Sequence, residues 1–76
     1  MKKEIEDKYN YARRECKLNT KIRFNGEDTI YIVCGNPYVE HKCLRVLIKT
    51  DDSRAYSAKT LVYDNGLINY TFVWKI

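Results

Sequence analysis

The chain has 76 residues, 45% of them hydrophobic and 32% charged, with a formal net charge of +4, the profile of an ordinary folded domain rather than a disordered or fibrous protein. This length allows one domain, residues 1–76, with a small core, since such a chain buries only about 60% of the surface that its unfolded form exposes. No apolar run approaches the roughly 18 residues of a membrane span, and the charged start is unlike a signal peptide. Three cysteines without a close pair argue against a secreted disulfide framework, so we expect a cytoplasmic protein without membrane contact.

The first predicted element is an amphipathic α-helix over residues 3–17. Its apolar positions recur at intervals of four, three and four, and they are Ile5, Tyr9, Ala12 and Cys16. This spacing places them on one stripe of a helix.

The first 25 residues hold eight basic and four acidic side chains, whereas the rest of the chain is balanced. Any long-range attraction of an acidic partner therefore comes mostly from this segment.

Residues 20–76 are predicted to form an antiparallel sheet, because the period of the apolar residues changes to two. Residues 21–24 and 29–34 flank the turn signal Asn25-Gly26 and form a first hairpin. Pro37 then interrupts the ladder, since proline has no amide proton to donate.

The segment 36–42 is a candidate binding loop. Tyr38 and His41 project polar-tipped rings from it, and Pro37 restricts its backbone. Loops on a rigid sheet are common recognition sites, so Tyr38 and His41 are candidate contacts. The alternative is a plain connector between two strands.

The cysteines allow two chemical sites, and neither is complete. A zinc site would use the permitted ligand types Cys16, Cys34, His41 and Cys43. Their spacing contains no CxxC pair, so packed thiols and a solvated histidine are the favoured interpretation. A nucleophilic Cys43 beside His41 lacks an orienting group and a pocket. We therefore expect no metal, no cofactor and no enzyme activity.

A third strand is predicted over residues 44–49, with Val46 and Ile48 facing the core. A turn at Asp51-Asp52 would place Lys49 beside Arg54 and Leu47 beside Tyr56. The predicted exposed surface then consists of Arg45, Lys49, Arg54, Tyr56 and Lys75.

The last two strands are predicted to pair through a two-residue turn at Asn65-Gly66. This register gives an apolar core face with the pairs Tyr63–Ile68, Leu61–Tyr70, Lys59–Phe72 and Ser57–Trp74, and it leaves Val62 on the solvent face. The predicted fold is α+β, with the N-terminal helix packed on a five-stranded antiparallel meander that can curl into a small half-open barrel. An open edge strand of such a sheet can pair with a second copy in a dimer.

Two functions follow from these surfaces. The chain contains seven tyrosines, and exposed tyrosine and arginine commonly anchor protein interfaces. We therefore expect a small non-enzymatic binding protein that occludes a surface of a larger partner. The AT-rich codons of its abundant residues suggest a low-GC bacterium or its phage, whose accessory proteins include inhibitors of host defence systems. The alternative is a small β-barrel that binds nucleic acid through the basic face that contains Tyr56. These basic side chains can instead serve only to keep the edges of the sheet from pairing with another sheet.

Overall fold

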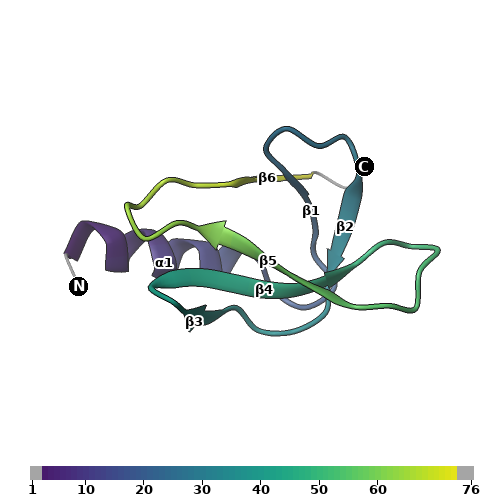
Figure 1. Ribbon diagram of the computed structural model, residues 1–76, viewed down its shortest axis with the longest axis horizontal. Helices are drawn as coiled ribbons and strands as arrows, with labels where there is room; N and C mark the ends of the chain where they lie inside the picture. The colour runs from purple at the N-terminus through teal and green to yellow at the C-terminus, as the bar shows by residue number, and fades with distance from the viewer. Residues whose placement is uncertain (1–2, 74–76) are drawn as a thin grey trace.

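One helix is followed by six strands in the computed structural model, which describes residues 3–73 (Figure 1). The elements are α1 (Lys3–Glu15), β1 (Lys21–Phe24), β2 (Ile30–Val33), β3 (Tyr38–Glu40), β4 (Cys43–Lys49), β5 (Ser57–Val62) and β6 (Tyr70–Phe72). The paired strands run antiparallel, so the predicted α+β class is confirmed. The sheet has six strands in place of the expected five, and the additional strand is β3. Within residues 3–73, no helix combines the length and the apolar character needed to cross a membrane.

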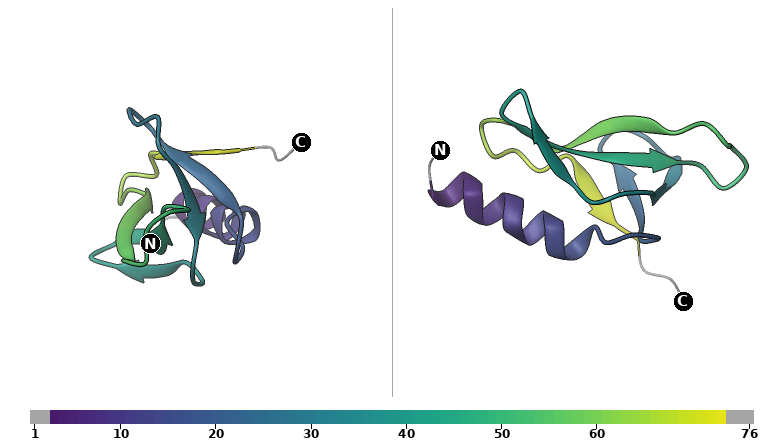
Figure 2. Two further views of the ribbon diagram at one scale, coloured as in Figure 1. Left: turned by 90° about the vertical axis from the view of Figure 1, so that its right-hand side faces the viewer. Right: turned by 90° about the horizontal axis from the view of Figure 1, so that it is seen from below.

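Helix α1 lies along one side of the sheet (Figure 2). The apolar stripe of the helix packs with residues of the strands in one core. Tyr9 and Ala12 are buried, and so is Cys16 just beyond the last helical residue. The amide of Cys16 still donates to the carbonyl of Ala12 at 2.8 Å, which continues the helical pattern by one residue. Asn19 then adopts a φ of 71°, a left-handed conformation that asparagine tolerates better than most residues. The predicted helix is therefore confirmed, with its end two residues earlier.

Strand β4 is paired along both edges. The strand order is β3-β4-β2-β1-β6, and β5 pairs with the remaining edge of β4. The first part of β4 pairs with β3, and its last two residues pair with β2 along the same edge. The sheet curls around the core but does not close into a barrel.

The core lies between α1 and the side of the sheet that faces it. Its buried side chains are Tyr9, Ala12, Cys16, Ile22, Phe24, Val33, Leu44, Val46, Ile48, Leu61, Val62 and Tyr70. Val46 and Ile48 face the core as predicted. Burial of each large aliphatic side chain contributes about 1.5–3 kcal/mol to the free energy of unfolding.

The predicted register of the last hairpin is wrong, because its loop has three residues and not two. The amide of Gly66 donates to the carbonyl of Tyr63, and the amide of Tyr63 donates to the carbonyl of Leu67, both at 2.9 Å. Gly66 has a φ of 86°, the left-handed position that closes a three-residue hairpin loop. Val62 therefore bridges to Ile68, one residue away from the predicted pair Tyr63–Ile68.

This shift of one residue changes the predicted faces only next to the loop, since Leu61 and Tyr70 are buried as predicted. Val62, expected in solvent, is fully buried, whereas Tyr63 and Ile68 are exposed. Beyond the loop the chain leaves β5, and β6 pairs with β1, where Phe72 lies opposite Ile22 and not Lys59. The proposed pair of Ser57 with Trp74 lies outside the described residues.

The register between β4 and β5 differs from the prediction by two residues. Leu47 pairs with Ala58 and not with Tyr56, because four unpaired residues, 53–56, follow the turn at Asp51-Asp52. A shift of two residues keeps β4 and residues 57–60 of β5 on their predicted faces of the sheet, whereas the β-bulge between Leu44 and Arg45 turns Val62 to the core side. Lys49 accordingly stays on the outer face, away from α1.

Candidate binding surfaces

The predicted binding loop 36–42 is largely a strand and a tight turn. Tyr38–Glu40 forms β3, and Glu40 pairs with Cys43 across the turn. The two turn residues His41 and Lys42 have φ values of 51° and 63°. Two consecutive positive φ angles define the two-residue turn that matches the twist of a hairpin. The prediction of a loop is therefore wrong for residues 38–40. The turn after them was not foreseen because turns of this type normally carry asparagine and glycine, and neither stands at position 41 or 42.

A buried tyrosine holds this turn against the helix. Tyr9 on α1 is 1% exposed, and its hydroxyl donates to the backbone carbonyl of Lys42. Burial is the main cause that raises the pKa of Tyr9, so the phenol keeps its proton and remains a donor. The helix thereby fixes the position of the β3–β4 turn and of His41 next to it.

The β3 surface consists of Tyr38, Val39, Glu40, His41 and Arg45. All three residues of β3 are exposed, and β3 lies at the end of the strand order. Tyr38 lies directly opposite Arg45 on the outer face of the sheet. The guanidinium of Arg45 donates to the carbonyl of Ala58 at 2.9 Å and lies 3.5 Å from the carboxylate of Glu40. The structure thus brings together Tyr38, His41 and Arg45, which the sequence placed on two separate surfaces.

A second group of basic side chains lies at the other end of β4. Ile32 on β2 pairs with Lys21 on one side and with Lys49 on the other, so the three residues form one line across three strands. We call this line the basic row. Tyr56 directly precedes Ser57, which pairs with Ile48, so it lies near Lys49 just before β5, and it is 60% exposed.

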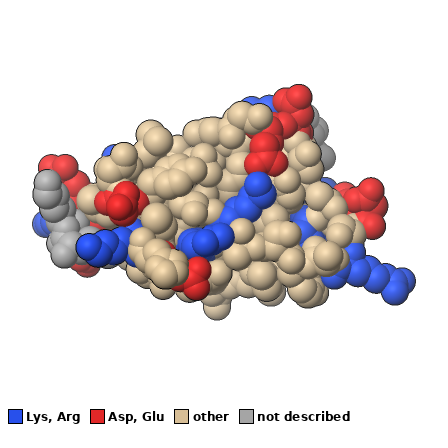
Figure 3. Space-filling model, in the orientation of Figure 1, with Lys and Arg blue, Asp and Glu red and all other residues tan. Residues whose placement is uncertain are grey.

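The predicted basic surface is therefore only partly retained. Lys49 and Tyr56 lie at the basic row, Arg54 lies in the loop beside it, and Arg45 belongs to the β3 surface. Lys75 lies outside the described residues. Lys21 joins Lys49 because β2 pairs with β4, as the predicted meander requires, although Lys21 was not part of the predicted basic surface. In the orientation of Figure 3, Lys and Arg side chains gather in a broken band over β4 and β5, with acidic side chains beside it.

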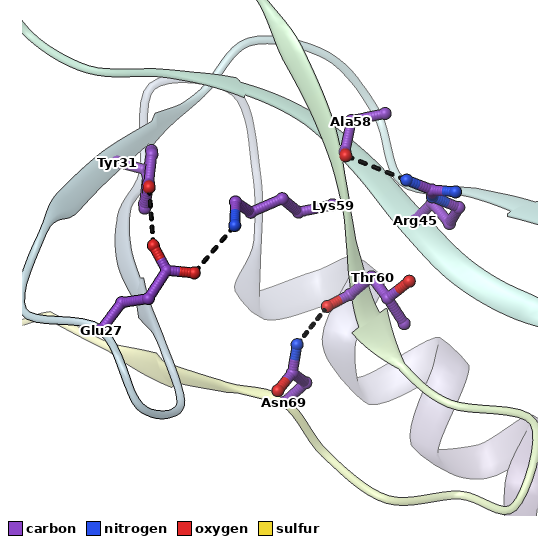
Figure 4. Close-up of polar contacts among 7 residues, drawn as sticks. All are labelled: Glu27, Tyr31, Arg45, Ala58, Lys59, Thr60 and Asn69. Carbon is purple, nitrogen blue, oxygen red and sulfur yellow. Dashed lines mark hydrogen bonds and ion pairs between the residues drawn. The ribbon is translucent and has the colours of Figure 1, made fainter.

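An ion pair spans the open side of the sheet between β5 and the β1–β2 hairpin (Figure 4). Lys59 Nζ lies 2.8 Å from Glu27 Oε2, and the hydroxyl of Tyr31 donates to Glu27 Oε1 at 2.7 Å. The hydrogen bond from Lys59 is the main cause that lowers the pKa of Glu27, and the same bond raises the pKa of Lys59. The ammonium also lies 5.4 Å from the centre of the Phe24 ring. This lysine is neutralised internally, so it is a structural residue rather than a ligand contact.

The candidate zinc ligands do not converge. Cys16 is buried in the core, where desolvation raises its pKa to about 12, and it is a poor metal ligand for that reason. The thiol of Cys34 donates to the carbonyl of Ile32 at 3.4 Å, and His41 lies exposed in its turn. Within residues 3–73, no three His, Cys, Asp or Glu side chains are grouped to hold a metal ion.

A hollow of about 350 Å³ lies at the β1–β2 turn, lined by Arg23, Phe24, Asn25, Gly26, Glu27 and Asp28. These six residues are consecutive, and their charges have both signs. The hollow contains no nucleophile beside a base, so its chemistry points to no reaction.

Comparison with protein-family models, with curated proteins and with solved structures finds no match. The two surfaces on the outer face of the sheet are therefore the basis for the function proposed below.

Proposed function

We propose that this chain is a non-enzymatic binding protein that acts by covering a surface of a larger protein. The observation that carries the proposal is the β3 surface, where Tyr38 on an exposed edge strand lies opposite Arg45. Tyrosine and arginine are the residue types that most often dominate the binding energy of protein interfaces. A phage or mobile-element inhibitor of a host defence complex is the class of function that we propose on the grounds of size and composition.

The backbone of Tyr38 and the guanidinium of Arg45 are held in place before any partner binds. Pairing with β4 fixes the backbone of Tyr38, and the carbonyl of Ala58 and the carboxylate of Glu40 hold the guanidinium of Arg45. Arg45 therefore loses little further side-chain entropy on binding, a loss that otherwise costs about 0.5–1.5 kcal/mol per immobilised side chain. The outer edge of β3 also offers a place where an extended segment of the partner can add a strand.

Capture of the partner tests this proposal. Tagged protein would be incubated with lysate of a low-GC bacterium, divided into nuclease-treated and untreated halves and washed at low and at high salt. We expect one protein in stoichiometric amount that is retained after nuclease treatment and high salt. Recovery of nucleic acid alone, lost as the salt concentration rises, would contradict the proposal.

Matched variants connect the captured protein to the β3 surface. The double variant Tyr38→Ala, Arg45→Ala should reduce retention by at least roughly tenfold, because truncation of a central interface residue typically costs about 2 kcal/mol or more. Tyr11→Ala is the control, since Tyr11 is an exposed tyrosine on α1, away from β3. Equal retention by the double variant and the control would remove the β3 surface from the proposal.

A further inference from the structure

We propose that the basic row is a second binding surface, distinct from the β3 surface, and that its ligand is single-stranded nucleic acid. Lys21 and Lys49 would contact backbone phosphates, and Tyr56 would stack on a base next to them. This inference goes beyond the proposed function and does not depend on it, because it concerns other residues and another class of ligand.

The alternation of the three strands directs the basic row outward. Ile22, Val33 and Ile48, each next in sequence to a member of the row, are buried in the core. Because side chains alternate along a strand, the members of the row point to the opposite face. Two strand spacings separate Lys21 from Lys49, which is about 10 Å between their Cα atoms. Both lysines are half-buried, and half-buried lysines generally lay their stems along apolar surface and keep the ammonium group in water.

The charges of the row are not neutralised within the described protein. Among residues 3–73, the ion pairs join Arg45 to Glu40 and Lys59 to Glu27, and neither includes Lys21 or Lys49. The nearest acidic residues along the chain are Asp51 and Asp52 in the turn after β4, and the carboxylate of Asp52 accepts a hydrogen bond from Thr50 at 3.0 Å. Two like charges placed together repel each other, and a bound polyanion removes that repulsion.

Further basic side chains extend the positive surface on both sides of the row. Arg23 follows Lys21 by two residues on β1, so it shares the outer face and lies opposite Thr71 of β6. Arg54 is exposed in the β4–β5 loop near Lys49. Cations spread across several strands match the regularly spaced phosphates of a nucleic-acid backbone better than they match the single compact charge of a small anion.

The position of Tyr56 favours single-stranded nucleic acid over an acidic protein surface. Its ring is among the most exposed large apolar side chains of the described residues and lies at the end of the row. Base stacking on such a ring is the usual partner of phosphate contacts in single-strand binding, because unpaired bases present their faces. An acidic protein would use the lysines but has no unpaired bases to stack on this exposed ring.

Fluorescence anisotropy with purified protein and a labelled oligothymidylate of about 12 nucleotides tests the inference, since single-strand sites commonly cover about 4–16 nucleotides. We expect log affinity to fall linearly with log salt between about 50 and 200 mM. The double variant Lys21→Gln, Lys49→Gln should bind roughly tenfold more weakly, with a slope smaller by about 1.4, or about 0.7 per lost phosphate contact. Tyr56→Ala should weaken binding by about tenfold, and Tyr56→Phe should retain most of the affinity.

The control double variant is Lys3→Gln, Lys42→Gln, which removes the same charge from exposed positions far from the row. Equal loss of affinity in both double variants would show a diffuse charge effect and overturn the inference. Equal binding of polyglutamate, or no binding of the oligonucleotide at the lowest salt concentration, would overturn it as well. The single lysine variants give the same comparison if the double variant does not fold.

Discussion

Replacing Tyr9 with phenylalanine should loosen the contact between α1 and the β3–β4 turn. The substitution keeps the buried ring and removes the hydroxyl that donates to the carbonyl of Lys42. Loss of a donor to a buried acceptor costs about 1–3 kcal/mol. Lys42 is exposed, so water can replace part of the lost bond, and we expect a cost near the lower limit, about 1 kcal/mol. In a domain of this size that cost lowers the unfolding temperature by about 4–8 °C.

Thermal unfolding followed by circular dichroism measures this cost, and Tyr11→Phe is the matched control. Tyr11 lies two residues away on the same helix, and its hydroxyl donates to Glu15 at an exposed site, at 3.2 Å. Exposed hydrogen bonds of this kind contribute little, so the control should melt within about 2 °C of the unmodified protein. If Tyr9→Phe and the control unfold at the same temperature, the hydrogen bond from Tyr9 to the carbonyl of Lys42 does not stabilise the β3–β4 turn. The conclusion that Tyr9 fixes the position of this turn would then be refuted.

Three further predictions concern the core, the ion pair and the β3–β4 turn. Cys16 should resist a thiol reagent at pH 8 in the folded protein and react only after denaturation, because burial raises its pKa to about 12; rapid labelling of the native protein would contradict this. Glu27→Gln should lower the unfolding temperature at neutral pH. Because Lys59 holds the pKa of Glu27 below its ordinary value of 4.5, the ion pair stabilises the protein above that pH and loses its effect as the pH falls further. The difference in unfolding temperature between variant and unmodified protein should therefore shrink in acid, and a difference that stays constant down to pH 3 would argue against the ion pair. The double variant His41→Asn, Lys42→Gly should be more stable by about 1 kcal/mol, since asparagine and glycine adopt positive φ at lower cost; an unchanged or lower unfolding temperature would refute this turn assignment.

The local elements of this fold could be predicted because their signals lie within a few residues of each other. The stripe of Ile5, Tyr9 and Ala12 defines the buried side of α1, and Asn25-Gly26 separates β1 from β2. Alternation alone gave the two faces of β4, and a register error of two residues left those faces unchanged.

The errors arose where two local conformations were compatible with the same residues. Asn65-Gly66 fits both a two-residue and a three-residue loop, and the choice moves the partner of Ile68 from Tyr63 to Val62. The turn at His41-Lys42 was missed because it lacks the asparagine and glycine that usually mark a two-residue hairpin turn, so no local signal indicated that β3 would form.

The candidate surfaces were predicted only in part, because they depend on pairings between distant segments. Arg45 and Lys49 could be placed on one face of β4 from the sequence. The pairing of Tyr38 with Arg45 required β3, which was not predicted. The predicted meander does place β2 between β1 and β4, but it did not give the register that aligns Lys21, Ile32 and Lys49. These contacts are set by the packing of the whole sheet, and no nearby residue encodes them.

Strand β4 carries a residue of each proposed surface, Arg45 of the β3 surface and Lys49 of the basic row. Four residues of a strand span only about 13 Å, whereas a small protein domain is about 30 Å across. A protein seated on Tyr38 and Arg45 would therefore overhang Lys49, and a nucleic-acid strand on the row would obstruct that protein in turn. The two ligands would compete for one molecule, and the ratio of their concentrations would decide which of them it holds.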